Sequence, residues 1–454
     1  MLFHPLARSI GPLLPSARTI SSSKSPALIA ELPFGPTLRM KRYAFKNGLR
    51  MLTLLDRTAP VVSFHTWFSV GSRNEQKGKT GLAHLFEHLM FNETKRAKKG
   101  QFDQRIESAG GETNASTWTD WTHYHTELPA SQLNVIMELE ADRMHNLVLR
   151  PPQVRSEKDV VANERRFRVD DDVEGEAHEL LYRLAYKRHP YGHPTIGSMR
   201  DIKGFTPRDC ERFYKTYYAP NNALLVVAGD FNEKKLLADV QRLYGKLKPA
   251  QLPPPPTIKE LPQREERVRR LYRPTPTRKL ALGYHAPAFG EADYSVLSLI
   301  NEILFVGRSA RVYQRLVRKE QLAAEVHAGI APFVDPGLYD IWITLQPDAA
   351  LGKTLKVLDE ELDRITSKRV TAAELMRVKN RAELAFLMAM ETSAGKAEQL
   401  GFYETVLGDA GKLMQRLEDF RAVTADDVLR VARKVLDAQG RTRIEVLPAK
   451  GKRA

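Results

Sequence analysis

Two histidines and a glutamate within one short apolar segment are the residues with the clearest chemistry. The segment from Gly81 to Asn92 is GLAHLFEHLMFN and contains His84, Glu87 and His88. In a helix, His84 and His88 lie one turn apart on the same face, with Glu87 beside them. Two imidazoles at this spacing can bind zinc, and an adjacent carboxylate can act as general base toward the attacking water.

The same five-residue pattern, H-x-x-E-H, has a purely structural alternative. Apolar side chains occupy the helical positions that would face a core: Leu82, Leu85, Phe86, Leu89 and Met90. A buried amphipathic helix with two hydrogen-bonded histidines would show the same pattern. These residues alone leave both interpretations open, and a third metal ligand has to decide between them.

The neighbouring segments predict both strands and helices around this helix. Residues Val61–Val70 form an apolar, β-branched and aromatic run, which indicates a strand. Residues Gly100–Ala109 indicate a second helix that ends at two glycines. Residues Glu112–Leu128 are rich in Thr, Trp and Tyr and indicate two strands, and Ser131–Asn146 has a helical period. Strands and helices in this order predict an α+β domain.

A rival metal site lies in the predicted strands. His123 and His125 alternate along one strand and would face the same side, which is also a zinc-ligand geometry. No third ligand is evident at a fitting distance in the sequence. We therefore expect these two to be ordinary strand histidines.

Two glutamates on a later helix are candidates for the missing ligand. A Pro-Pro pair at 151–152 starts this helix, and Glu157 and Glu164 are seven positions apart, so they share a face. Glu164 lies 76 positions after His88. Taken alone, either glutamate could equally belong to the solvated face of a charged helix.

The combination of these residues resembles the pitrilysin, insulinase and mitochondrial processing peptidase family of zinc metallopeptidases, in its short two-domain form. The inverted motif H-x-x-E-H followed by a glutamate about 76 positions later is the signature of that family. The resemblance runs across nearly the whole chain after the first forty residues. Further segments that match are GSRNE (71–75), FNET (91–94), GGETNAST (110–117), ERR (164–166) and HPYGHPTIG (189–197).

The resemblance implies a role for each of these residues. His84, His88 and Glu164 would bind one zinc ion per chain, and Glu87 would be the general base. Glu157 would support catalysis without being a primary ligand.

The resemblance also implies a place for the substrate. Asn114, Ala115, Ser116 and Thr117 would belong to an edge strand on which a peptide substrate is laid. Main-chain hydrogen bonds along such an edge would tolerate many side chains.

The chain length and a proline-rich segment predict two domains. A chain of 454 residues is too long for one ordinary core. We expect an N-terminal arm or targeting segment at 1–37, a catalytic domain at 38–248, a proline-rich linker at 249–278 and a non-catalytic domain at 279–454. The second domain repeats the order of the first, but SLINEIL stands where H-x-x-E-H would be. The resemblance implies two homologous α/β sandwiches, each a mainly antiparallel sheet covered by helices, facing across a cavity.

One position departs from the family pattern. The segment RKEQLAAE aligns Arg318 with a substrate-binding arginine of the family, but Glu325 stands where many active members have a tyrosine. This can be tolerated drift. The alternative, which we favour, is that a related subunit carries the Arg/Tyr pair, so we expect a homodimer or such a heterodimer.

Composition excludes some classes of protein and leaves the compartment open. Net charge is +15, but the basic residues are spread along the chain without a nucleic-acid motif, and no apolar run reaches the length of a membrane span. The single cysteine, Cys210, excludes an intrachain disulfide. Residues 1–30 contain no acidic residue, which fits a mitochondrial transit peptide or an unstructured arm. We expect the bacterial cytoplasm, with the mitochondrial matrix or periplasm as alternatives.

The sequence thus predicts a zinc-dependent endopeptidase subunit that hydrolyses peptides or unfolded polypeptide segments. The alternative is a non-catalytic structural or peptide-binding subunit of a related complex.

Overall fold

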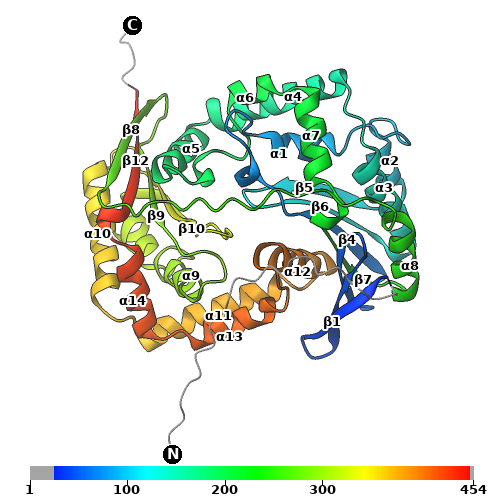
Figure 1. Cartoon of the computed structure of the whole chain (residues 1–454). Coiled ribbons are helices and arrows are strands. Elements are labelled where there is room, and N and C mark those ends of the chain that lie inside the picture. Colours follow the sequence, from blue (N-terminus) through cyan, green and yellow to red (C-terminus); the bar gives the residue numbers. More distant parts are fainter. Residues whose placement is uncertain (1–24, 450–454) are drawn as a thin grey trace, which may run out of the picture.

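The computed structural model describes residues 25–449 and contains two sheets, which define a first and a second half of the chain (Figure 1). The seven strands of the first sheet are β1 (Ala27–Phe34), β2 (Leu38–Ala44), β3 (Arg50–Leu55), β4 (Val61–Phe68), β5 (Glu112–Thr117), β6 (Thr122–Pro129) and β7 (Ala223–Gly229). The five strands of the second sheet are β8 (Arg267–Arg273), β9 (Lys279–His285), β10 (Ala323–Ile330), β11 (Leu338–Leu345) and β12 (Arg441–Pro448).

Helices cover both sheets. Those of the first half are α1 (Leu82–Leu89), α2 (Gln101–Ser108), α3 (Leu133–Asn146), α4 (Pro151–Arg165), α5 (Val173–Ala185), α6 (Met199–Gly204), α7 (Pro207–Tyr217) and α8 (Glu233–Tyr244). Those of the second half are α9 (Ala292–Leu304), α10 (Leu351–Ser367), α11 (Ala372–Met388), α12 (Ser393–Leu407), α13 (Lys412–Ala422) and α14 (Ala425–Val435). The expected fold class, two α/β sandwiches, is confirmed.

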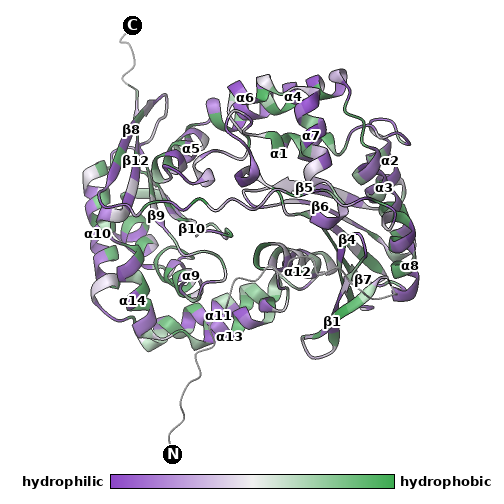
Figure 2. Cartoon of the chain, in the orientation of Figure 1, coloured by the Kyte–Doolittle hydropathy of each residue, from purple (hydrophilic) through white to green (hydrophobic). Residues whose placement is uncertain are grey.

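Alternation along β4 shows why this sequence forms a strand between two layers. Val62, Phe64 and Phe68 face the helices of the first half, whereas Trp67 faces the opposite core. A strand buried on both faces becomes a central strand, and β4 lies between β7 and β6. The outer helices are instead two-sided, with hydrophilic and hydrophobic residues alternating around each coil (Figure 2).

The two halves share one strand topology. The first sheet has the order β1-β2-β3-β7-β4-β6-β5, and the second has the order β10-β11-β9-β12-β8. The run β3-β7-β4-β6-β5 of the first sheet corresponds to β8-β12-β9-β11-β10 of the second. In both runs the first two strands pair parallel, and all later pairs are antiparallel. This repeat agrees with the expected duplication of a mainly antiparallel domain.

The halves exchange equivalent helices. Helix α5 follows α4 in the first half, but it packs on the second sheet, where Ala177 and Leu181 share a core with Trp342. Helix α12 follows α11 in the second half, but it packs on the first sheet, where Leu400 shares a core with Trp67. Both helices lie between the two sheets in Figure 1.

A buried polar network also joins the halves. Arg73 donates to Asp120 of the first half (3.0 Å) and to Asp335 of the second (2.5 Å). Asp120 further accepts from the hydroxyl of Tyr191 (2.9 Å) and from the amide of Val334 (3.0 Å). We call these five residues the interhalf clamp. It fastens the β10–β11 loop against the segment that precedes α1.

Two strands lie in segments that we expected to be irregular. β1 falls within the expected arm at 1–37, and β8 falls within the expected linker at 249–278. In β8 (RVRRLYR) Leu271 alone is buried, and the strand is held by parallel pairing with β12. Between α8 and β8 the chain is otherwise free of helix and strand, and the remaining domain bounds stay predictions.

Some expectations concern residues that the structure does not describe. Residues 1–24, on which the predicted targeting segment and compartment depend, and residues 450–454 at the C-terminal end lie outside the described part. Among the described helices, none combines the length and apolar character needed to cross a membrane.

Candidate metal centre

Helix α1 begins at a tightly fixed point. Its N-cap residue Gly81 has φ of 93°, in the left-handed region that favours glycine, and a Cβ there would lie 2.4 Å from the carbonyl oxygen of Ile196. The buried carboxylate of Glu75 accepts hydrogen bonds from the amides of Gly81 and Ala83, both at 2.8 Å. A negative charge at a helix N-terminus is favourable. The next residue after Ala83 is His84, so the helix start places this histidine.

Helix α4 brings the third residue to α1. Val161 and Ala162 are buried in the first core, and this orientation turns Glu164 toward α1. The helix end is anchored by Arg165, whose guanidinium donates to the carbonyl of Gly197 (2.6 Å) and to Glu179 (2.9 Å). A short π-helix, Arg166–Asp170, follows directly.

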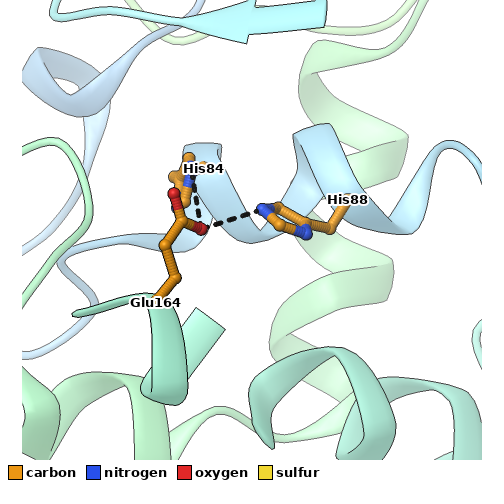
Figure 3. A group of neighbouring side chains, drawn as sticks. All are labelled: His84, His88 and Glu164. Atoms are coloured by element: carbon orange, nitrogen blue, oxygen red, sulfur yellow. Dashed lines mark ion pairs between the residues drawn. The ribbon is translucent and has the colours of Figure 1, made fainter. Parts of the chain in front are cut away.

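The three predicted metal ligands converge (Figure 3). Oε2 of Glu164 lies 3.6 Å from Nε2 of His84 and 3.4 Å from Nε2 of His88. One donor atom of each residue lies within 4.8 Å of the others, and among the described residues this is the one such group of three. The side chains of His84, His88 and Glu164 are only 12%, 25% and 19% exposed.

Burial and the contacts among these residues shift their protonation. Burial lowers the pKa of His84 to about 4, against the opposing charge of Glu164, so this imidazole is neutral near pH 7. Burial also acts to lower the pKa of His88, but the contact with Glu164 and the charges of Glu87 and Glu157 together outweigh burial and raise that pKa, so a bound cation would replace a proton on this ring. The contact with His88 in turn lowers the pKa of Glu164. The carboxylate is therefore ionised and ready to bind a cation.

Glu87 lies beside the two histidines and is largely buried. Burial raises the pKa of Glu87, while the hydroxyl of Thr117 and the charge of His88 oppose this rise. Thr117 is the last residue of β5, so this strand ends next to the carboxylate. Glu87 is thus close both to the predicted metal ligand His88 and to the end of the predicted substrate strand.

Glu157 lies behind His88 rather than among the three convergent donors. Its Oε2 is 4.0 Å from Nδ1 of His88, and its Oε1 accepts from Nζ of Lys99 at 2.8 Å. The carboxylate of Glu157 is 8% exposed. This placement fits a residue that orients His88 from the ring side that faces away from Glu164.

The predicted substrate strand is the outermost strand of the first sheet. β5 contains Asn114, Ala115, Ser116 and Thr117 and pairs with β6 alone among the described strands. Its other edge is unpaired, and Asn114 is exposed there. β5 can therefore accept an additional strand.

The rival histidine pair has a third imidazole that the sequence analysis did not identify. His65 of β4 pairs with His125 across the sheet, and its Nδ1 lies 2.9 Å from Nε2 of His123. The other ring nitrogen of His65 is hydrogen-bonded to Ser63 at 2.8 Å. The hydrogen bonds of His65 to His123 and Ser63 occupy both of its ring nitrogens, and the three imidazoles do not converge as a ligand group among the described residues. They remain strand histidines, as expected.

Arg318 and Glu325 lie in the second half. Arg318 is exposed in a π-helix (Tyr313–Lys319), and Glu325 is exposed on β10, the outer strand of the second sheet. No ion pair of either side chain is recorded within residues 25–449. The substrate role of Arg318 stays a prediction.

The residues present fit zinc. Two imidazoles and one carboxylate that converge on one point, with partial exposure, are a donor set that zinc binds while keeping a position open. Nδ1 of His84 is buried without a hydrogen-bond partner among the described residues, so no protein contact competes for the orientation of that ring.

Comparison with known proteins places this site in a family. The family model described as insulinase (peptidase family M16) matches residues 50–199, which include all three convergent residues. The zinc protease PqqE of Helicobacter pylori is 31% identical over 402 residues, which cover 87% of this chain and 90% of that protein. The chain belongs to peptidase family M16.

Other M16 relatives agree with this assignment. The crystal structure of a protease from Helicobacter pylori superposes with a TM-score of 0.86 at 30% identity, covering 90% of this chain and 99% of that chain. A probable β subunit of the mitochondrial processing peptidase of Arabidopsis thaliana is 24% identical over 86% of this chain and 75% of its own length. The likeness thus extends over both halves.

A second family model matches a range that runs from the first half into the second. Residues 204–382 match the model described as the peptidase M16 inactive domain. Helix α9 follows β9 as α1 follows β4, and its sequence ADYSVLSLINEIL contains no histidine. The duplicated half therefore repeats the fold of the M16 domain without the histidine pair.

Proposed function

We propose that this chain is a zinc-dependent endopeptidase subunit that cleaves peptides or unfolded polypeptide segments. The observation that carries the proposal is the convergence of His84, His88 and Glu164 beside the carboxylate of Glu87. The named zinc proteases among its relatives support the same reaction class. One zinc ion per chain would be held by the three convergent residues.

Each side chain has a distinct task in the proposed reaction. When bound, zinc supplies Lewis-acid chemistry that polarises the scissile carbonyl and acidifies the attacking water. Glu87 accepts the proton of that water and returns it to the leaving amine, because its carboxylate lies beside the ligands without being one of them. Glu157 keeps the ring of His88 in place.

The substrate would be held as an added strand. A peptide that pairs with the free edge of β5 passes the end of the strand at Thr117, close to Glu87. Main-chain hydrogen bonds provide much of the affinity in this mode, so many side chains are accepted. A folded protein cannot present an extended segment of this kind, which restricts substrates to short or unfolded chains.

The first test compares hydrolysis of a mixture of unstructured peptides by the zinc-loaded chain and by Glu87→Gln. Loss of the general base lowers the rate by about 10²- to 10⁴-fold. The matched control is Glu107→Gln, an exposed glutamate of α2, which should cleave like wild type. Zinc content is measured in parallel, and His84→Ala should lose the metal while His145→Ala, at an exposed position, keeps it.

Two outcomes would reject the proposal for the chain by itself. If zinc does not bind, the chain is a structural or peptide-binding subunit. If zinc binds and neither wild type nor Glu87→Gln cleaves any peptide, the site is formed but incomplete.

A partner subunit is the second candidate for the complete enzyme. The specific observation is Glu325 at the position where many members of the resembled family have a tyrosine. We propose that a related subunit contributes an Arg/Tyr pair in a heterodimer; in a homodimer the second copy would also carry Glu325, and the site would lack the tyrosine. Full activity of the purified chain at a dilution where only monomer is present would refute this.

A further inference from the structure

A cation contacts the outer oxygen of Glu164. Arg168 follows Glu164 by four residues, within the π-helix after α4, and its Nε lies 3.0 Å from Oε1 of the carboxylate. The other oxygen, Oε2, is the one that faces His84 and His88. The two oxygens of one carboxylate are thus divided between a guanidinium and the imidazole pair.

This arrangement determines which of the two carboxylate oxygens of Glu164 faces the histidine pair. The terminal torsion of a glutamate is broad and roughly two-fold, so the side chain alone does not fix which oxygen faces the histidines. The ion pair with Arg168 holds Oε1 and leaves Oε2 to converge with the two Nε2 atoms. Outer partners of metal ligands commonly set ligand orientation and metal affinity in this way.

An exposed ion pair at i,i+4 usually contributes little to stability, and the side chain of Arg168 is 69% exposed. Two features distinguish this pair. Glu164 is 19% exposed, so few water molecules can replace the arginine as its donor. The backbone beneath Arg168 is also fixed, because the neighbouring Arg165 is buried and bonded to Gly197 and Glu179. The arginine therefore starts from an anchored position.

We propose that Arg168 is a positioning residue that presents Oε2 of Glu164 to the histidine pair and thereby raises the affinity for zinc. The inference rests on the proposed metal site. The positive charge of Arg168 acts in the opposite direction, since it repels a cation. Because the guanidinium is largely exposed, water screens its effect on a cation beyond the carboxylate, while the direct 3.0 Å ion pair with Oε1 still orients Glu164.

The test measures zinc affinity by competition with a chromogenic chelator, without any peptidase assay. Arg168→Met removes both the donor and the charge, and we expect about tenfold weaker zinc binding, the low end of the effect of lost outer partners. Arg168→Lys keeps a charged donor and should stay within about threefold of wild type. Arg166→Met is the matched control, because within residues 25–449 the side chain of this exposed arginine has a hydrogen bond to Asn163 and none to Glu164, and the variant should bind zinc like wild type.

The outcomes separate this inference from the proposed function. Arg168→Met that binds zinc as tightly as wild type, or more tightly, overturns the positioning role. Equal losses in Arg168→Met and Arg166→Met would also overturn it, since they would reflect general loss of positive charge. Wild-type protein that binds no zinc overturns both proposals. Wild-type protein that binds zinc but cleaves nothing overturns the peptidase activity alone, and the Arg168 comparison then stands on the affinities.

Discussion

Replacement of Asp120 by alanine should destabilise the whole molecule through the interhalf clamp. The carboxylate of Asp120 is 3% exposed and binds three donors: the guanidinium of Arg73, the hydroxyl of Tyr191 and the amide of Val334. Arg73 is itself 8% exposed. Asp120→Ala leaves these donors in place and removes the charge that compensates them.

The expected loss follows from what remains buried. Breaking a buried ion pair by removing one partner costs about 3–5 kcal/mol, because an uncompensated charge stays in the interior. Asp335 still contacts Arg73, and its side chain is 33% exposed, so part of the charge stays paired. We therefore expect a loss in the free energy of unfolding of about 3 kcal/mol, at the lower end of that range. With an unfolding entropy of about 2.1 cal/mol/K per residue over 454 residues, this lowers Tm by about 3 °C if both halves unfold together.

Thermal unfolding followed by calorimetry and by intrinsic fluorescence provides the measurement. Asp171→Ala is the control, because this exposed aspartate makes no recorded side-chain contact within the described residues and should change Tm by less than a degree. A double-mutant cycle with Arg73→Met isolates the pair, since contacting residues couple by about 0.5–3 kcal/mol. The reasoning would be refuted if Asp120→Ala had the same Tm as Asp171→Ala. It would also be refuted if the double-mutant cycle showed no coupling between Asp120 and Arg73.

Two further predictions concern burial on the sheets. Burial raises the pKa of Asp340 on β11 to about 6, and its neighbour His178, 4.0 Å away on α5, has a pKa lowered by burial and stays neutral. The folded state therefore holds the proton of the Asp340 carboxyl more tightly than the unfolded chain does. The resulting contribution to the free energy of unfolding is complete below about pH 4 and is lost as pH rises through 6, a change of up to about 3 kcal/mol. Asp340→Asn should therefore gain stability over wild type at pH 7.5 by up to about 3 kcal/mol and at pH 4.5 by only about 1 kcal/mol, measured by Tm, and a pH-independent difference would contradict this. On α12, a Cβ at Gly401 would lie 2.1 Å from Nε1 of Trp67, so Gly401→Ala should cost about 1–3 kcal/mol. Gly352→Ala on the exposed face of α10 meets no atom within 4 Å and should gain about 0.5–1 kcal/mol, so equal Tm shifts in the two variants would exclude the packing argument.

The elements that carry the site could be predicted because their signals are local. H-x-x-E-H specifies its own helix face, and the spacing of Glu157 and Glu164 specifies another, so α1 and α4 follow from residues three to seven positions apart. The strands β4 and β5 follow from runs of β-branched and aromatic residues, which are also local signals. The sequence could not show that Glu164 meets the histidine pair, and the family resemblance provided that step.

The contacts that stabilise the site could not be predicted, because they join residues far apart in the chain. Glu75 caps α1 through backbone amides, and Lys99 reaches Glu157 across 58 positions, and neither contact has a periodic signal. β8 was missed because its arginines look like solvated linker, whereas its pairing with β12 depends on the main chain. A signal for Arg168 did exist, since it stands four positions after Glu164.

The exchange of α5 and α12 gives the second half a part in the site although it contributes no ligand. Glu164 lies at the end of α4, which packs in the first half, and the chain passes through one π-helix into α5, which packs on the second sheet. There Glu174 accepts from Lys279 (2.5 Å), and Glu176 accepts from Arg273 (2.6 Å). The segment that carries Glu164 and Arg168 is therefore fixed at both ends, by the first half before it and by the second half after it. A duplicated half that has no histidine pair thus has a structural part in the site, because without it the segment after Glu164 would be held by the first half alone.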